Sequence, residues 1–177
     1  MNVSGKRISR KEKTAFHEAG HAVAAYLLRK KFLYVTIKSN GVFEGYVMHG
    51  QTPLVLQGEW EDERIRRSAL ERDILISLAG GVVNLLLTGK RDHLGSYTDL
   101  HHALDLAGHV CGSKKECTAY VNWLFVRCEG MVKSPPNWHA VETLAGELLK
   151  REKIPYRKAR EIIQAAKKEF RDRKNHV

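Results

Sequence analysis

The segment His17-Glu18-Ala19-Gly20-His21 constrains the fold of this chain most, because it places three ionisable side chains in an apolar stretch. Phe16 precedes it and Ala22-Val23-Ala24-Ala25 follows it. The apolar spacing predicts a helix from about Ser9 to Lys30, in which residues four apart share one face. Two imidazoles and a carboxylate would be costly to bury in such a helix without partners. A metal ion would supply the missing partner, so the segment predicts a metal site.

The spacing of His17 and His21 lets both rings present a nitrogen to one ion, and histidine is a preferred zinc ligand. Glu18 lies about 100° further around the helix axis, beside the ion rather than on it. There it would act as a general base towards a zinc-bound water, whose pKa zinc lowers to about 7. The alternative is a helix with two surface histidines and an incidental glutamate, because the chain has nine histidines and the motif is short.

A catalytic zinc needs a third protein ligand and one open position. The extended motif HExxHxxGxxH is absent, since Ala24 and Leu27–Leu28 hold its later positions. The twenty positions after His21 contain no acidic residue, so the third ligand must come from a more distant element. The candidates are Glu71, Asp73, Asp92, His93, Asp99, His101, His102 and Asp105.

The remaining pattern predicts one α-rich α+β domain with a small β-sheet. Two short strands are expected at Tyr34–Lys38 and Gly45–His49, with turn residues at Ser39-Asn40-Gly41 between them. Gln51–Trp60 contains proline and glycine and is expected to be an exposed loop. A long helix is expected at Glu61–Leu87, which starts polar and becomes apolar as a helix entering a core does.

The second half of the chain is expected to be helical. After a loop at Thr88–Gly95, another helix begins at Ser96, and Ser134-Pro135-Pro136-Asn137 is the clearest break. Two amphipathic helices follow, with Pro155 suited to the first turn of the second. Their predicted bounds are Trp138–Lys150 and Tyr156–Lys174. We expect a core over residues 1–133 and a C-terminal helical pair over residues 134–177, packed on the same domain.

Composition indicates a cytoplasmic protein. The longest apolar stretch, Ile74–Leu87, is shorter than the roughly 20 residues that span a bilayer, and no apolar segment follows the charged N-terminus. The three cysteines are odd in number and lack CxxC spacing, which favours free thiols in a reducing compartment. They are Cys111, Cys117 and Cys128.

The net charge of +10 suggests affinity for anions, and the basic residues are clustered. Acidic residues are interleaved in two of the clusters, and no nucleic-acid-binding signature accompanies them, so nucleic acid is not expected as the main partner. The clusters are Lys6–Lys13, Arg29–Lys31, Arg64–Arg72 and Lys167–Lys174.

Several segments, in order along the chain, make it similar to the peptidase domain of FtsH-type ATP-dependent zinc proteases. Thr14–Val23 looks like the motif helix of that family, and Gly95-Ser96-Tyr97-Thr98-Asp99-Leu100 resembles the segment whose aspartate is the third zinc ligand. Further segments resemble its strand pair, its long apolar helix and its C-terminal helical pair. These are Tyr34–Ile37 with Gly45–Val47, Leu78–Val82, and His139–Ile163.

The resemblance implies one Zn²⁺ per chain, with His17, His21 and Asp99 as ligands and Glu18 as the base. Asp99 has another reading, as an acidic residue in the first turn of a helix capped by Ser96. His101 and His102 are the next candidates for the third ligand. A residue could also both ligate and favour the helix dipole.

The resemblance also implies that an extended substrate adds as a strand at Gly45, Tyr46 and Val47. The alternative is an ordinary edge strand, which every open sheet has.

Two departures from the family matter. The chain has no GxxxxGK[ST] phosphate loop and no membrane segment, so we expect it to act without its own ATPase, with a separate ATPase or adaptor as a candidate partner. Asn84 and Leu85 stand where the family usually has paired acidic residues.

The expected function is a zinc metallopeptidase acting on unfolded or flexible polypeptides. The alternative is a catalytically silent zinc-containing module that binds peptides or docks on a partner. An oligomer is compatible with either.

Overall fold

The computed structural model describes residues 8–39, 41, 45–49, 63–90 and 97–175. These residues form a mostly helical α+β structure with six helices and a small three-stranded antiparallel sheet, as the sequence predicted. The elements in chain order are α1 (Arg10–Leu27), β1 (Tyr34–Thr36), β2 (Tyr46–Met48), α2 (Glu63–Thr88), α3 (Tyr97–Ala107), α4 (Lys114–Lys133), α5 (Pro135–Arg151), β3 (Lys153–Pro155) and α6 (Tyr156–Asn175).

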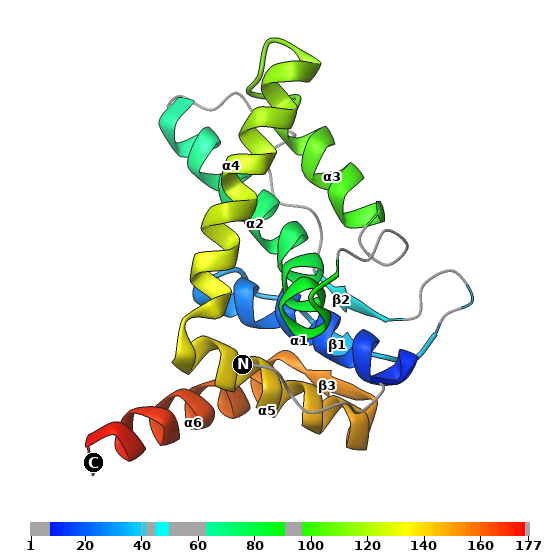
Figure 1. Cartoon of the computed structure of the whole chain (residues 1–177), viewed down its shortest axis with the longest axis vertical. Helices are drawn as coiled ribbons and strands as arrows, with labels where there is room; N and C mark the ends of the chain where they lie inside the picture. Colours follow the sequence, from blue (N-terminus) through cyan, green and yellow to red (C-terminus); the bar gives the residue numbers. More distant parts are fainter. Residues whose placement is uncertain (1–7, 40, 42–44, 50–62, 91–96, 176–177) are drawn as a thin grey trace.

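Helix α1 lies at the centre of the molecule, with α2, α3 and α4 towards one end and the sheet, α5 and α6 towards the other (Figure 1). It begins at Ser9 as predicted, through a capping box in which Ser9 and Glu12 each accept the other's backbone N–H. It ends at Leu27 rather than Lys30, because Arg29 adopts the left-handed conformation with φ of 59°. Its residues from Ala19 to Ala25 are all buried.

Glycine allows α1 and α2 to pack unusually close together. A Cβ at Gly20 would lie 2.7 Å from Val83 Cγ2 and 2.9 Å from the Ala79 carbonyl oxygen, so no larger residue fits there. Helix α2 is therefore the element that approaches α1 at this position. The predicted long helix is confirmed as α2, whose described part starts at Glu63 and ends at Thr88.

The sheet has the order β2-β1-β3, with Val35 of β1 paired to Val47 on one side and to Ile154 on the other. Both predicted strands are present, but each is three residues long and therefore shorter than predicted. The sequence did not predict β3, and it placed Pro155 in the first helical turn. Pro155 instead ends β3, and α6 begins at the next residue.

Glu152 is the reason that the chain turns back to form β3. It closes α5 in the left-handed conformation, and its carbonyl oxygen accepts hydrogen bonds from Ile37 N and Thr36 Oγ1 at 2.8 and 2.9 Å. Its carboxylate pairs with Lys11 at the start of α1. These contacts tie the end of α5 to β1 and α1.

The break at residues 134–137 is shorter than predicted. Helix α5 begins at Pro135, because proline at the first helical position loses no hydrogen bond and has a suitable φ. Ser134 alone separates α4 from α5, and α4 itself was not predicted as a separate helix. Helix α5 packs on α1 and α6, so the C-terminal helices lie against the helix that carries His17 and His21. A domain boundary at residue 133 stays a prediction.

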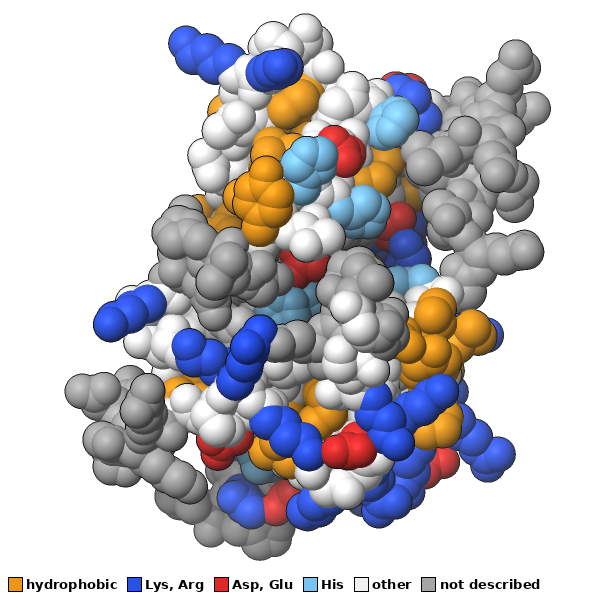
Figure 2. All heavy atoms as spheres, turned by 90° about the vertical axis from the view of Figure 1, so that its right-hand side faces the viewer, with side chains coloured by type: hydrophobic (Ala, Val, Ile, Leu, Met, Phe, Trp, Pro, Cys, Tyr) orange, Lys and Arg blue, Asp and Glu red, His pale blue; other side chains and the backbone are white. Residues whose placement is uncertain are grey.

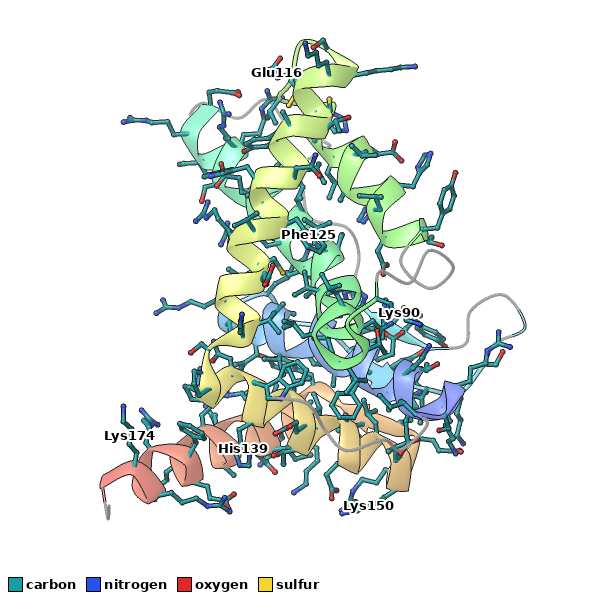
Figure 3. The ribbon with its side chains drawn as sticks, in the orientation of Figure 1. Lys90, Glu116, Phe125, His139, Lys150 and Lys174 are labelled. Carbon is teal, nitrogen blue, oxygen red and sulfur yellow. The ribbon has the colours of Figure 1, made fainter. Side chains whose placement is uncertain are left out.

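The molecule is elongated. Glu116, in the first turn of α4, lies at one end, and Lys150 and Lys174, near the ends of α5 and α6, lie at the other (Figure 3). Among the residues that the structure describes, no helix combines the length and the apolarity needed to cross a membrane.

Candidate metal centre

Three of the predicted site residues meet at one point between α1, α2 and α3. His17 Nε2 and His21 Nε2 lie 3.0 Å apart, and Asp99 Oδ2 lies 2.9 Å from the first and 3.3 Å from the second. The histidines occupy successive turns of α1, and Asp99 lies in the first turn of α3. Both imidazoles are only 8% exposed. Within the described part of the chain this is the one cluster of three such groups that could hold a metal ion.

The other candidate third ligands that the structure describes are engaged elsewhere. His101 pairs with Asp105 at 3.1 Å, and His102 Nδ1 contacts Ser77 Oγ at 2.9 Å. Asp73 accepts from Lys30, and Glu71 accepts from Tyr120. Asp92 and His93 lie outside the described residues, as does Ser96, the expected cap of α3.

The cluster fits a metal ion on its own geometry. Asp99 Oδ2 is buried and has no hydrogen-bond partner, although it faces two ring nitrogens. Gly80 of α2 closes the other side, where a Cβ would lie 2.6 Å from His17 Nε2. Glycine costs helix stability, so its presence here is explained by the space that the histidine rings occupy. Two nitrogens and one carboxylate oxygen form a donor set that suits zinc.

The second nitrogen of each ring is also held. His21 Nδ1 donates to the Ile76 carbonyl oxygen at 2.7 Å, so that Nε2 faces the cluster and offers its lone pair there once it is deprotonated. His17 Nδ1 lies 3.3 Å from Asn84 Nδ2, whereas Asn84 Oδ1 is buried without a partner. Amide nitrogen and oxygen are assigned from their contacts. Turning the Asn84 amide over would give Oδ1 the Nδ1–H of a metal-binding His17.

Glu18 lies beside the cluster without joining it. Its side chain is buried at 5% exposure, and it is not one of the three grouped ligands. A Cβ at Gly45 would lie 2.8 Å from Glu18 Cγ and 3.0 Å from Glu18 Oε1, so the residue that leads into β2 packs directly on this carboxylate. Burial raises the pKa of Glu18, and the neighbouring His21 and His17 oppose that rise.

Charge coupling within the cluster is strong in the metal-free protein. Burial alone would raise the pKa of Asp99, but His21 and His17 outweigh it and hold that pKa well below its usual range. Burial likewise lowers the pKa of His21. Asp99, with smaller contributions from Glu18 and the Ile76 carbonyl, reverses this and raises the pKa to about 9.

On the face shown in Figure 2, histidine and acidic side chains gather in the half that holds α3. Lys and Arg side chains dominate the half that holds α5.

No protein-family model matches this chain. A comparison with curated proteins also finds no match. The resemblance to FtsH-type peptidases therefore stays a prediction that rests on the motifs quoted above, and the roles of the site residues rest on their chemistry and geometry.

Replacing Asp99 with alanine should sharply reduce the zinc held per chain, because it removes one of three ligands. Loss of a supporting contact alone typically weakens metal affinity about 10- to 100-fold, and loss of a direct ligand should weaken it at least as much. The measurement is elemental analysis after dialysis against a weak chelator. Asp105→Ala is the matched control, since Asp105 lies on the same helix and its side chain is 66% exposed. Equal zinc in both variants would remove Asp99 from the site.

Asn84→Leu should weaken zinc binding about 10- to 100-fold, because it removes the acceptor that holds the His17 ring and keeps the number and branching of the side-chain heavy atoms. Asn84→Asp keeps an oxygen acceptor and should retain affinity. Competition with a chromogenic chelator measures both, and circular dichroism of the metal-free proteins reports whether each variant folds. If Asn84→Asp binds zinc as weakly as Asn84→Leu does, Asn84 acts only in packing.

Zinc binding should release about one proton per ion near neutral pH. His21, with a pKa of about 9, carries that proton in the metal-free protein and must lose it to ligate. Affinity should therefore rise about tenfold per pH unit between about pH 6 and 8. Titration calorimetry in buffers of different ionisation enthalpy counts the protons. A count of zero would contradict the coupling.

The raised pKa of His21 also determines how the stability of the metal-free protein changes with pH. A raised histidine pKa contributes stability that is fully present below the unfolded pKa, near 6.5, and is lost as pH rises through about 9. The melting temperature of the metal-free protein should therefore fall as the pH is raised across this window.

Proposed function

We propose that this chain is a zinc-dependent metallopeptidase that hydrolyses peptide bonds in unfolded or flexible polypeptides. The observation that carries the proposal is the juxtaposition of three ligand atoms with a buried carboxylate that is not a ligand. A site that only held a structural ion would have no use for Glu18.

His17, His21 and Asp99 would hold the zinc, which supplies Lewis acidity to the substrate carbonyl and to an attacking water. Glu18 would take the proton from that water and deliver it to the leaving amine. Its burial between α1 and Gly45 keeps its carboxylate fixed beside the ligands. Asn84 and the Ile76 carbonyl would orient the two imidazoles during the cycle.

The arrangement of β2 supports a polypeptide substrate. In the sheet order, β2 is an outer strand, and it starts one residue after Gly45, which contacts Glu18. A segment added along Gly45, Tyr46 and Val47 would therefore pass next to the general base. Such binding reads mainly the backbone and requires an extended chain, which favours unfolded or flexible substrates over folded ones.

The FtsH-type peptidase fold is part of this proposal, and so is a separate ATPase or adaptor that delivers substrate. The second candidate function is a catalytically silent zinc-containing module that binds peptides or docks on a partner. The observation that favours it is Asn84, a neutral residue at a position where the family that this chain resembles usually has an acidic residue. The side chain that contacts His17 Nδ1 is therefore an amide.

Glu18→Gln should abolish hydrolysis while leaving zinc in place. General-base catalysis contributes about 10²- to 10⁴-fold, so the rate on a fluorescently labelled flexible protein such as casein should fall by at least about 100-fold. Zinc content and melting temperature, measured on the same sample, show that the Glu18→Gln variant is folded and contains zinc. Hydrolysis by Glu18→Gln at the wild-type rate would exclude Glu18 as the general base. A zinc-loaded wild type that binds the substrate without cleaving it would establish the silent module instead.

A further inference from the structure

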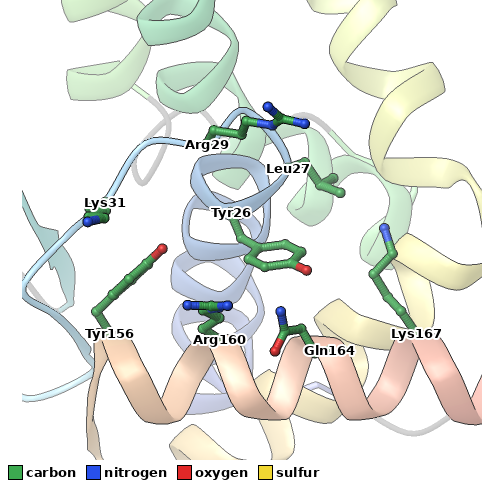
Figure 4. A pocket seen from close by; sticks show the side chains of 8 residues that line it. All are labelled: Tyr26, Leu27, Arg29, Lys31, Tyr156, Arg160, Gln164 and Lys167. Carbon is green, nitrogen blue, oxygen red and sulfur yellow. The ribbon is translucent and has the colours of Figure 1, made fainter.

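The basic segment Arg29–Lys31 and one face of α6 lie far apart in the sequence but line the same hollow, which we name the α1–α6 basic hollow (Figure 4). Tyr26 reaches it from α1, and Arg160 and Lys167 rise into it from α6. Its volume is about 490 Å³, within the range of small-ligand sites. Its lining residues are Tyr26, Leu27, Arg29, Lys31, Tyr156, Arg160, Gln164 and Lys167.

The lining contains four cationic side chains and no carboxylate. Arg29, Lys31 and Arg160 form no ion pair with any residue that the structure describes. The adjacent face of α6 is different, because Arg157 and Lys158 both pair with Glu161. Among the described residues, the cations that line the hollow therefore lack the carboxylate partner that Arg157 and Lys158 share on α6.

Two of the lining side chains are held in place before any ligand arrives. Lys167 Nζ donates to Asn137 Oδ1 at 2.7 Å, and the Tyr156 ring packs edge to face on Phe32 with centroids 5.0 Å apart. Burial, with a smaller contribution from the nearby Arg171, lowers the pKa of Lys167.

Arg29 is unusual in its backbone. It adopts a φ of 59° directly after α1, where glycine is the residue of least strain. An arginine there costs stability and places a guanidinium at the rim of the hollow.

We propose that the α1–α6 basic hollow binds a ligand that carries two or more phosphoryl groups. Each phosphoryl group brings between one and two negative charges and oxygens that match the guanidinium fork, so two groups balance four cations. Tyr26 and Tyr156 offer hydroxyl donors and ring faces to the rest of the ligand. Tyr26 follows His17 by nine residues, which is about 180° around α1, so the hollow and the zinc cluster use opposite faces of one helix.

The test is titration calorimetry of the full chain with inorganic pyrophosphate at about 0.1 M salt, which screens diffuse attraction. Arg160→Gln should weaken binding at least about tenfold, since a charge-assisted fork is lost. Arg157→Gln is the matched control, because it removes the same charge from a residue that is 94% exposed and already paired. It should change binding less than about twofold.

Arg29→Gly separates binding from folding. It should raise the melting temperature, because glycine relieves the positive φ, and weaken pyrophosphate binding in the same protein. A variant that is more stable yet binds less cannot have lost affinity through misfolding.

The source of the phosphoryl groups is distinguished by a second arm, sedimentation with phosphatidylcholine vesicles that contain phosphatidylinositol bisphosphate. Vesicle binding that Arg160→Gln abolishes, without pyrophosphate binding, assigns the hollow to a lipid headgroup. Pyrophosphate binding assigns it to a soluble ligand. The proposal is overturned if Arg157→Gln and Arg160→Gln weaken binding equally, if neither probe binds, or if polyglutamate binds through Arg160 while both phosphoryl probes fail.

Discussion

The close approach of α1 and α2 is the constraint on which the rest of this structure depends. Gly20 admits the side chain of Val83, and Gly80 admits the two imidazoles, so each helix uses glycine where the other needs room. Helix glycine normally costs roughly 0.5–1 kcal/mol relative to alanine. That cost is accepted at both positions because the rings of His17 and His21 must lie between the helices, with their Nδ1 atoms directed at α2.

Burial then couples the cluster to the remainder of the fold. Two buried imidazoles and the buried carboxylate of Glu18 destabilise a small protein unless their charges are matched. Asp99 matches the histidines from α3, and the hydrogen bond from His21 to Ile76 fixes α2 in rotation as well as in distance. The position of α3 is therefore linked to the ionic state of the cluster, and the cluster organises all three helices around it.

The sequence predicted this centre well because its signal is local. A four-residue spacing on an apolar helix identifies His17 and His21 without knowledge of the partner helix, and the α1 cap at Ser9 is equally local. Asp99 was one of eight candidates on chemistry alone, and only the family resemblance singled it out, because the choice depends on the path of a chain segment about eighty residues away. The structure brings it to the histidines and leaves the other described candidates with different partners.

The features that sequence reasoning missed are those created by distant pairing. A three-residue strand such as β3 has no periodicity of its own, and it forms because Glu152 turns the chain beside β1. Asn84 was noted only as a departure from a family pattern, since nothing in the sequence shows that its amide reaches His17. The α1–α6 basic hollow is invisible for the same reason, as its two basic segments are about 130 residues apart in the sequence.

The two sites have different relations to the fold. The cluster of His17, His21 and Asp99 lies where α1 is buried, so any change there must be accommodated by α2 and α3. The basic hollow lies at the C-terminal end of α1, and its lining residues are partly or fully exposed, so a ligand can enter it without displacing core side chains. Between the two sites, the side chains of Ala22 to Ala25 are short and wholly buried. They have little freedom to change rotamer. A ligand in the hollow would therefore influence the cluster through displacement of α1 as a rigid body or through long-range charge, rather than through a chain of side-chain movements.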